Sequence, residues 1–163
     1  MLEGRGEDIS PLPRLPDDPV GEIELKNERD VEMFLLEPLL KKLGFAERHW
    51  KRQVSIRLAC GDRVIPDYVI FPKGEHDNRS AYWVWEAKLS IAGGKQLKND
   101  FAQARSYALL LGCKGLGLAS KEGVWLSVPD YVAGKTRFWS WKQVSENDHL
   151  NDIFDIAGNK KGG

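Results

Sequence analysis

The sequence predicts one α/β domain in which helices flank a mixed β-sheet. Segments with helical and strand-like periodicity alternate along the chain, in the order helix, strands, helix, strands, helix. The length of 163 residues corresponds to one domain and allows a sizeable core. Hydrophobic residues make up 42% and charged residues 29%, a balance that is typical of globular proteins and excludes a mainly disordered chain.

The first helix is expected to begin after Asn27, which is a suitable N-cap with Asp30 three residues later. Apolar residues then recur at helical spacing until Gly44 ends the pattern. Pro38 lies inside this pattern and predicts a kink or a short break, because its ring prevents regular helical hydrogen bonding. The apolar residues are Val31, Phe34, Leu35, Leu39, Leu40 and Leu43.

Three strand-like runs follow the first helix. Residues 53–59 alternate between apolar and polar side chains, and residues 64–71 follow a turn signal. Residues 81–89 are rich in aromatic and β-branched side chains, which favours a central strand. The polar segment 73–80 predicts a hairpin loop, so the last two runs are expected to be antiparallel neighbours.

The second half of the chain predicts a further helix, short strands and a last helix. Gly93 and Gly94 precede a helix over residues 96–111, which Gly112 closes. The remaining expected elements are strands at residues 115–119, 124–128 and 138–141 and a helix at residues 149–157.

The folded domain is expected to span residues 22–158. Four prolines in residues 1–21 indicate an extended or mobile N-terminal arm, and residues 159–163 are expected to form a frayed tail. Neither an apolar run of membrane-spanning length nor a secretory signal is visible, so a cytoplasmic location without membrane contact is expected. Cys60 and Cys113 lack metal-site spacing and are expected to be buried thiols.

Formal charges cancel over the whole chain but are distributed unevenly. Residues 1–37 hold 11 acidic and 4 basic side chains, whereas residues 38–163 hold 13 acidic and 20 basic ones. A basic domain body favours a polyanionic partner, although many solvated surfaces share this balance.

Charged residues stand at two neighbouring strands of the predicted sheet. Asp67 follows Pro66 on the second run, and Glu86 and Lys88 end the apolar third run. Period two places Glu86 and Lys88 on one face of their strand and Ala87 on the other. Because the two strands are expected to pair, Asp67 can lie close to Glu86. Charges at the end of a buried strand are costly unless they are paired or bound to a metal ion.

A divalent metal ion would account for this cluster. The carboxylates of Asp67 and Glu86, with the backbone carbonyl of Ala87, form an all-oxygen site suited to Mg²⁺, for which Mn²⁺ can substitute. Such an ion can polarise a phosphate and lower the pKa of a water molecule that attacks in line. Lys88 can hold that water or offset the charge that develops on the phosphate. The alternative is a surface ion-pair cluster, which would contribute little to stability.

The series Pro66-Asp67, 18 residues, Glu86-Ala87-Lys88 resembles the motif of the PD-(D/E)XK nuclease superfamily. The resemblance implies a restriction-endonuclease-like fold and a Mg²⁺-dependent endonuclease that hydrolyses DNA phosphodiester bonds, leaving a 5′-phosphate and a 3′-hydroxyl.

The next predicted helix carries a second element of this resemblance. Gln103 and Tyr107 are four residues apart, share one helical face, and resemble the Gln-x-x-x-Tyr element of several families in the superfamily. The resemblance implies that they support the site or contact DNA. Tyr107 could equally be a packed core aromatic.

The region of the first helix resembles the opening of the nuclease domain in type I restriction enzyme R subunits, and the resemblance extends over residues 28–127. It implies that Glu28 matches a glutamate that helps to bind the metal ion. Glu32, one helical turn later, is the competing candidate, and an acid in a first helical turn is also favoured without any function. The matching segments are residues 27–31, 36–40 and 43–45.

R subunits continue into helicase domains, so this chain alone is not expected to translocate on DNA. The alternative to a nuclease is a nucleic-acid-binding or regulatory subunit of the same fold that acts only with a partner helicase or specificity protein. A homodimer is also open, since cutting both strands usually requires two active sites.

Basic side chains near the expected site are candidate phosphate contacts. Lys95, Lys98 and Arg105 lie on the helix that follows the site, and a basic run between residues 41 and 63 could also track a nucleic-acid backbone. A solvated surface is the alternative for each of them.

Overall fold

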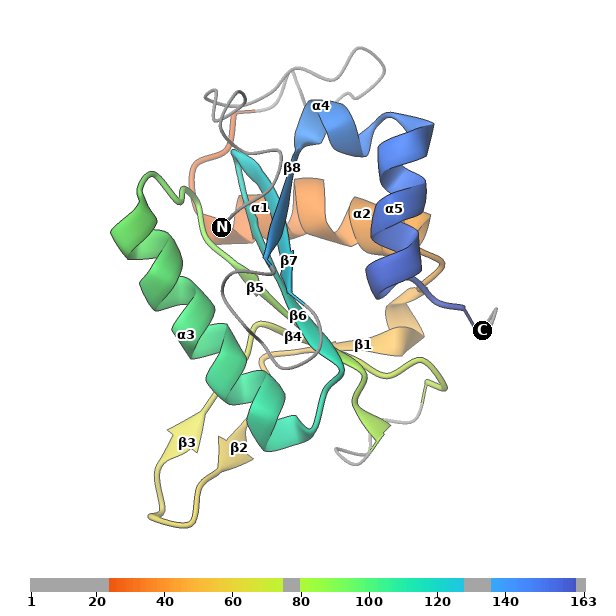
Figure 1. The fold of residues 1–163 in the computed structure, drawn as a ribbon. Coiled ribbons are helices and arrows are strands. Elements are labelled where there is room, and N and C mark those ends of the chain that lie inside the picture. Colours follow the sequence, from red (N-terminus) through yellow and green to blue (C-terminus); the bar gives the residue numbers. More distant parts are fainter. Residues whose placement is uncertain (1–23, 75–79, 128–135, 161–163) are drawn as a thin grey trace.

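A six-stranded mixed β-sheet forms the centre of the computed structural model, which describes residues 24–74, 80–127 and 136–160 (Figure 1). The predicted arm, residues 1–21, and residues 161–163 of the predicted tail lie outside the described residues. The elements, in chain order, are α1 (Glu28–Val31), η2 (Glu32–Leu36), α2 (Glu37–Lys42), η3 (Glu47–His49), β1 (Trp50–Arg52), β2 (Ile56–Arg57), β3 (Arg63–Val64), β4 (Tyr68–Ile70), β5 (Trp83–Ala87), α3 (Gly94–Leu111), β6 (Gly115–Ser120), β7 (Gly123–Ser127), β8 (Arg137–Ser140), α4 (Trp141–Val144) and α5 (Asn147–Ala157).

The strands of the central sheet lie in the order β1-β4-β5-β6-β7-β8. Strands β5 and β6 are parallel because α3 connects them as a crossover, and the other neighbouring pairs are antiparallel. This confirms the predicted mixed sheet. Strands β2 and β3 form a separate two-stranded sheet.

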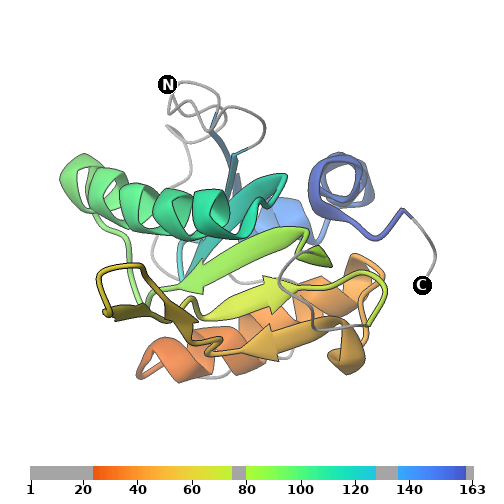
Figure 2. The ribbon, with the colours of Figure 1, turned by 90° about the horizontal axis from the view of Figure 1, so that it is seen from below.

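Two apolar clusters cover the two faces of the sheet. Helix α3 packs on one face, and α1, η2 and α2 pack on the other, as the view along the sheet shows (Figure 2). Side chains of α4 and α5 belong to the same cluster as those of α1 and α2. No helix in the described parts of the chain combines the length and apolar character that a membrane span requires.

The first helix begins as predicted, with Asn27 Oδ1 accepting a hydrogen bond from the Asp30 N–H at 2.9 Å. Helical backbone then continues to Lys42 but widens into π-helical turns at η2, which ends two residues before Pro38. In a regular α-helix the Pro38 ring would clash with the carbonyl of Phe34. The kink or short break predicted at Pro38 is therefore present as this π-helical segment.

Two of the predicted strands are wrong in their extent. Of the run over residues 53–59, only Ile56–Arg57 form a strand, β2. Gln53 adopts a left-handed conformation with φ 55°, which ends β1 and separates it from β2. The run over residues 64–71 is broken around Pro66, which has no N–H to donate to a strand ladder. Strand β1 was not predicted.

The later elements are confirmed, with boundaries that shift by at most two residues. Gly112 ends α3 in the left-handed conformation with φ 66°, as a helix C-cap requires. The short elements η3 and α4 were not predicted. Cys113 is buried as expected, whereas the expectation for Cys60 is wrong, because this residue lies exposed between β2 and β3.

Glycines in β6 allow the tryptophans of β5 to approach the neighbouring strand closely. Trp85 is fully buried and pairs with Gly117, where an added Cβ would lie 2.4 Å from Trp85 Cζ3. We expect Gly117→Ala to lower the free energy of unfolding by about 1–3 kcal/mol, as overpacking a core does. Urea denaturation measures this change. The matched control is Gly94→Ala in α3, where nothing lies within 4 Å of the added Cβ; an equal loss in both variants would contradict the close contact.

Candidate active site

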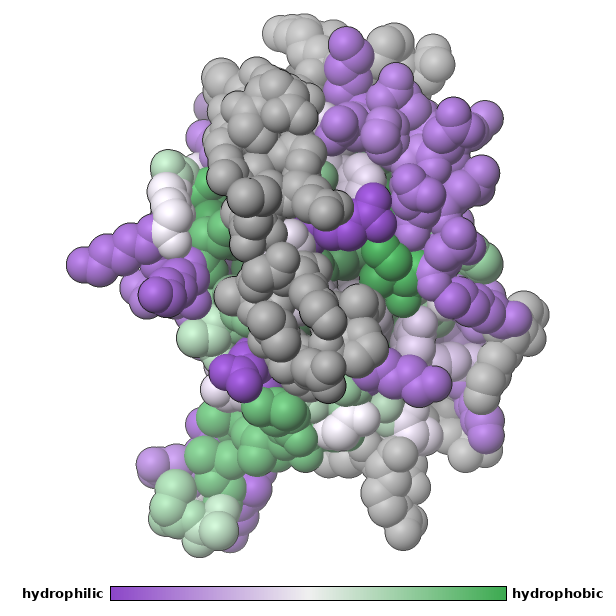
Figure 3. Space-filling model, in the orientation of Figure 1, coloured by the Kyte–Doolittle hydropathy of each residue, from purple (hydrophilic) through white to green (hydrophobic). Residues whose placement is uncertain are grey.

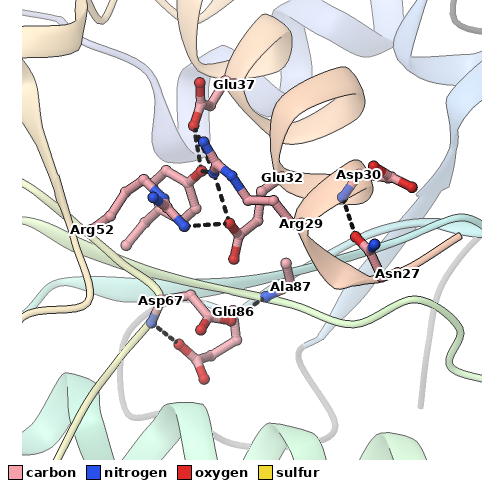
Figure 4. A network of polar contacts seen from close by, with 10 residues as sticks. Asn27, Arg29, Asp30, Glu32, Glu37, Arg52, Asp67, Glu86 and Ala87 are labelled. Atoms are coloured by element: carbon pink, nitrogen blue, oxygen red, sulfur yellow. Dashed lines mark hydrogen bonds and ion pairs between the residues drawn. The ribbon is translucent and has the colours of Figure 1, made fainter. Parts of the chain in front are cut away.

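Asp67 and Glu86 lie side by side on adjoining antiparallel strands, and each is held by the backbone of the other strand (Figure 4). The Asp67 N–H donates to Glu86 Oε2 at 2.5 Å, and the Ala87 N–H donates to Asp67 Oδ2 at 2.9 Å. Two reciprocal hydrogen bonds therefore fix both carboxylates. Among the described residues, the second oxygen of each carboxylate accepts no hydrogen bond.

The predicted alternation along β5 agrees with the packing. Ala87 belongs to the cluster under α1 and α2, whereas Val84 belongs to the cluster under α3. Glu86 has the parity of Val84 and so lies on the α3 side of the sheet. Lys88 follows β5 directly, is half-buried, and donates its backbone N–H to Ala119 O at 2.9 Å.

Burial perturbs both carboxyl groups. Desolvation raises the pKa of Asp67 to about 6 and that of Glu86, which is 4% exposed, to about 8. The negative charge of Asp67 further raises the pKa of Glu86, while the Lys88 ammonium lowers the pKa of both carboxyl groups. A buried and a half-buried carboxylate that repel each other beside one lysine form a place where a cation is electrostatically favoured.

The two glutamates of the first helix have different environments. Glu32 is buried, and its Oε1 accepts from Arg29 at 2.8 Å and from Arg52 at 2.9 Å. Glu28 is exposed, forms no ion pair among the described residues, and raises the pKa of both Asp67 and Glu86 through its charge. Glu32 is thus paired with two arginines, whereas Glu28 has no such partner among the described residues. The charges of both glutamates raise the pKa of Asp67, and that of Glu28 also raises the pKa of Glu86.

A polar network between the first helix and the sheet was missed by sequence reasoning. Arg29 Nη1 donates to Glu32 and, at 3.0 Å, to Tyr68 Oη, and the Tyr68 hydroxyl donates to Glu37. Tyr68 is adjacent to Asp67 in the chain, so the network ties the first helix to the strand of the site (Figure 4). Arg29 and Tyr68 are 39 residues apart, and no local pattern in the sequence signals their contact.

Helix α3 faces the carboxylate pair. Gln103 Nε2 donates to Tyr107 Oη at 2.8 Å, and Tyr107 is buried in the cluster beneath α3. Burial raises the pKa of Tyr107, and the charges of Glu86 and Asp67 raise it further. Tyr107 is therefore both a core aromatic and a neighbour of the two carboxylates.

The predicted phosphate contacts of α3 are available to solvent. Lys95, Lys98 and Arg105 are all exposed, and none of the three forms an ion pair within the described parts of the chain.

No model of a protein family and no curated protein sequence matches the chain. Two similar solved structures are the fragment structure of a putative HsdR subunit of a type I restriction enzyme from Vibrio vulnificus YJ016 and the DrdV–DNA complex. The first has 20% sequence identity and a TM-score of 0.50, and it covers 71% of this chain and 23% of that chain. The second has 13% identity and a TM-score of 0.53, and it covers 85% of this chain and 13% of that chain.

The chain has a restriction-endonuclease-like fold. At these sequence identities the fold is what the structures share, and the predicted fold class is thereby confirmed. The chain spans less than a quarter of the length of either similar chain.

On this restriction-endonuclease-like fold, the donor set of the site fits a hard divalent cation. Asp67 and Glu86 each offer a carboxylate oxygen without a hydrogen-bond partner among the described residues. Within the same residues, no group of three or more His, Cys, Asp and Glu is arranged to hold a metal ion. Mg²⁺ in proteins commonly binds one or two carboxylates and keeps several water ligands. Two carboxylates are therefore enough protein ligands for this ion.

Proposed function

We propose that the chain is a metal-dependent endonuclease of the PD-(D/E)XK type that hydrolyses phosphodiester bonds of DNA. The observation that carries the proposal is the pair of Asp67 and Glu86, half-buried and buried, which two backbone hydrogen bonds hold side by side near Lys88. The similarity to the HsdR subunit and to DrdV, which is bound to DNA, supports DNA as the substrate.

Asp67 and Glu86 would hold Mg²⁺, or Mn²⁺ in its place, together with the carbonyl of Ala87. The bound ion supplies Lewis acidity toward a phosphate oxygen and lowers the pKa of water. The two backbone hydrogen bonds hold both carboxyl groups in place before the ion arrives.

Lys88 would orient the attacking water and offset the negative charge that develops on the phosphate. Glu28 would be the helix carboxylate of the site, because Glu32 is already engaged by two arginines. Gln103 would support the site or grip the strand through its contact with Tyr107. Water attack on phosphorus would leave a 5′-phosphate and a 3′-hydroxyl.

The test is incubation of the purified chain with supercoiled plasmid in Mg²⁺, in Mn²⁺ and in EDTA. We expect nicked or linear DNA with either metal ion and intact plasmid in EDTA. Intact plasmid under all conditions, with no DNA binding, would contradict the proposal.

A second candidate function is a subunit that binds DNA but cuts only when a partner protein loads it. This alternative is favoured by the coverage of 23% and 13%, since both similar chains contain much more than the matched segment. DNA binding without cleavage in the plasmid assay would favour it. Its partner would be a helicase or a specificity protein.

Metal binding by Asp67 can be tested without measuring activity. We expect Asp67→Asn to weaken Mn²⁺ binding at least tenfold in calorimetry, because the substitution removes one of two anionic ligands. Asp155→Asn, on the exposed surface of α5, is the matched control and should bind Mn²⁺ as the wild type does. Equal affinity of Asp67→Asn and the wild type would remove Asp67 from the site.

A further inference from the structure

Strands β2 and β3 form a hairpin that projects from the central sheet below α3 (Figures 1 and 2). Ile56 and Val64 pair at its base and pack against the cluster beneath α3. One step further out, Arg57 pairs directly with Arg63. The base of the hairpin is thus anchored to the core, while the arginine pair lies on the projecting part.

The paired arginines are an unfavourable feature of an isolated hairpin. Both are exposed, and like charges directly opposite each other in a β-ladder are destabilising. Arg63 Nη1 donates to Ser55 Oγ at 2.9 Å, which leaves its charge uncompensated. Arg57 forms no ion pair within the described parts of the chain. A bound anion would relieve this repulsion.

The hairpin is tethered closely to the candidate active site. Arg63 precedes Asp67 by four residues, so their Cα atoms are at most about 14 Å apart. Phosphates along one DNA strand follow one another by about 3.4 Å of helix axis, so this reach covers only a few phosphates. An arginine here can contact the same strand that the carboxylate pair would cut.

The composition of the hairpin favours double-stranded DNA over single strands. Residues 54–65 contain no aromatic side chain, whereas proteins that grip single strands stack bases on aromatic rings. A two-stranded β-ribbon fits the major groove of B-form DNA, while the major groove of A-form RNA is too narrow. The space-filling view shows the hairpin standing clear of the body at the lower left (Figure 3).

We propose that the β2–β3 hairpin is a contact element for duplex DNA, in which Arg57 and Arg63 bind phosphates next to the scissile bond. This inference rests on the proposed nuclease function and deepens it, because it assigns the form of the substrate. The hairpin also carries Asp62, whose carboxylate accepts from Cys60 Sγ and opposes phosphate binding. Removing a positive charge from the hairpin should therefore weaken duplex binding, and removing the negative charge of Asp62 should strengthen it.

The experiment measures fluorescence anisotropy of a labelled 20-base-pair duplex, and of a single strand of the same length, in EDTA so that no cleavage occurs. We expect Arg57→Ala with Arg63→Ala to weaken duplex binding at least tenfold. The slope of log K against log salt should become shallower by about 1.8, which corresponds to two lost phosphate contacts. Lys142→Ala with Lys160→Ala, two exposed lysines outside the hairpin, is the matched control and should change the slope little.

Two further variants keep the test decisive if the double alanine variant fails to fold. Arg57→Lys with Arg63→Lys should retain the salt slope, and Asp62→Asn should strengthen duplex binding about twofold or more. Duplex binding that is insensitive to the arginines and to Asp62 would overturn the inference, as would an equal loss of single-strand and duplex binding. If the wild type neither binds nor cuts DNA, the proposed function itself fails. If the wild type cuts plasmid and the hairpin variants bind DNA as tightly as it does, only the inference about the hairpin is overturned.

Discussion

Replacing Lys88 with alanine is expected to reduce plasmid cleavage at least a hundredfold while leaving the fold intact. The Lys88 ammonium lowers the pKa of both Asp67 and Glu86, so we expect its charge to act at the carboxylate pair. Removing one preorganised group that stabilises transition-state charge costs about 10²–10³ in rate. The side chain is only half-buried, and among the described residues it makes no hydrogen bond or ion pair, so little stability is lost. The measurement is the initial rate of nicking in Mg²⁺ and in Mn²⁺.

Lys142→Ala is the matched control, because this exposed lysine lies on α4. Thermal unfolding followed by circular dichroism verifies that both variants fold as the wild type does. If Lys88→Ala cuts DNA as fast as the wild type with both metal ions, Lys88 has no catalytic role and the assignment of the active site to Asp67, Glu86 and Lys88 fails. A wild type that binds DNA without cutting it leads instead to the partner-dependent subunit.

The adjacency of Asp67 and Glu86 was predictable because it depends on short-range information. The two strands follow each other in the chain, and period two places Glu86 on a defined face. An apolar strand that ends in charged residues is visible in the sequence itself. Local patterns of this kind also located β5, α3 and the last strands.

The first strands could not be predicted to their ends, since tertiary packing decides them. Gln53 adopts a positive φ that non-glycine residues rarely take, and nothing in its neighbours announces this turn. The short hairpin of β2 and β3 therefore looks in sequence like the end of one strand and the start of another. Its separation from the central sheet emerges only when β1 pairs with β4.

Local sequence patterns likewise gave no ground for ranking Glu28 and Glu32. Both are acids on the first helix, and helical spacing treats them alike. Arg52, which binds Glu32, comes from β1 and is 20 residues away in the chain. Long-range ion pairs of this kind leave no periodic signal, so sequence reasoning could identify both candidates but could not separate them.

Replacing Glu86 with glutamine is expected to stabilise the metal-free protein at alkaline pH by about 2–5 kcal/mol. Burial raises the pKa of Glu86 from 4.5 to about 8, so between these values the folded state retains a proton that the unfolded state has lost. The contribution of this proton to the free energy of unfolding is fully present below about pH 4.5 and is lost as the pH rises to about 8. Each unit of pKa shift corresponds to about 1.36 kcal/mol. Glutamine keeps an acceptor for the Asp67 N–H and removes the charge.

Urea denaturation in EDTA between pH 5 and pH 9 measures this effect. The wild type should lose stability across this range, and Glu86→Gln should show a much flatter profile, with a residual decline near pH 6 that comes from Asp67. Glu47→Gln, at an exposed position in η3, is the matched control and should follow the wild type. Parallel profiles for Glu86→Gln and the wild type would show that the pKa of Glu86 is not raised in the folded protein. Added Mn²⁺ should restore the alkaline stability of the wild type far more than that of Glu86→Gln, because the ion neutralises the same repulsion that the substitution removes.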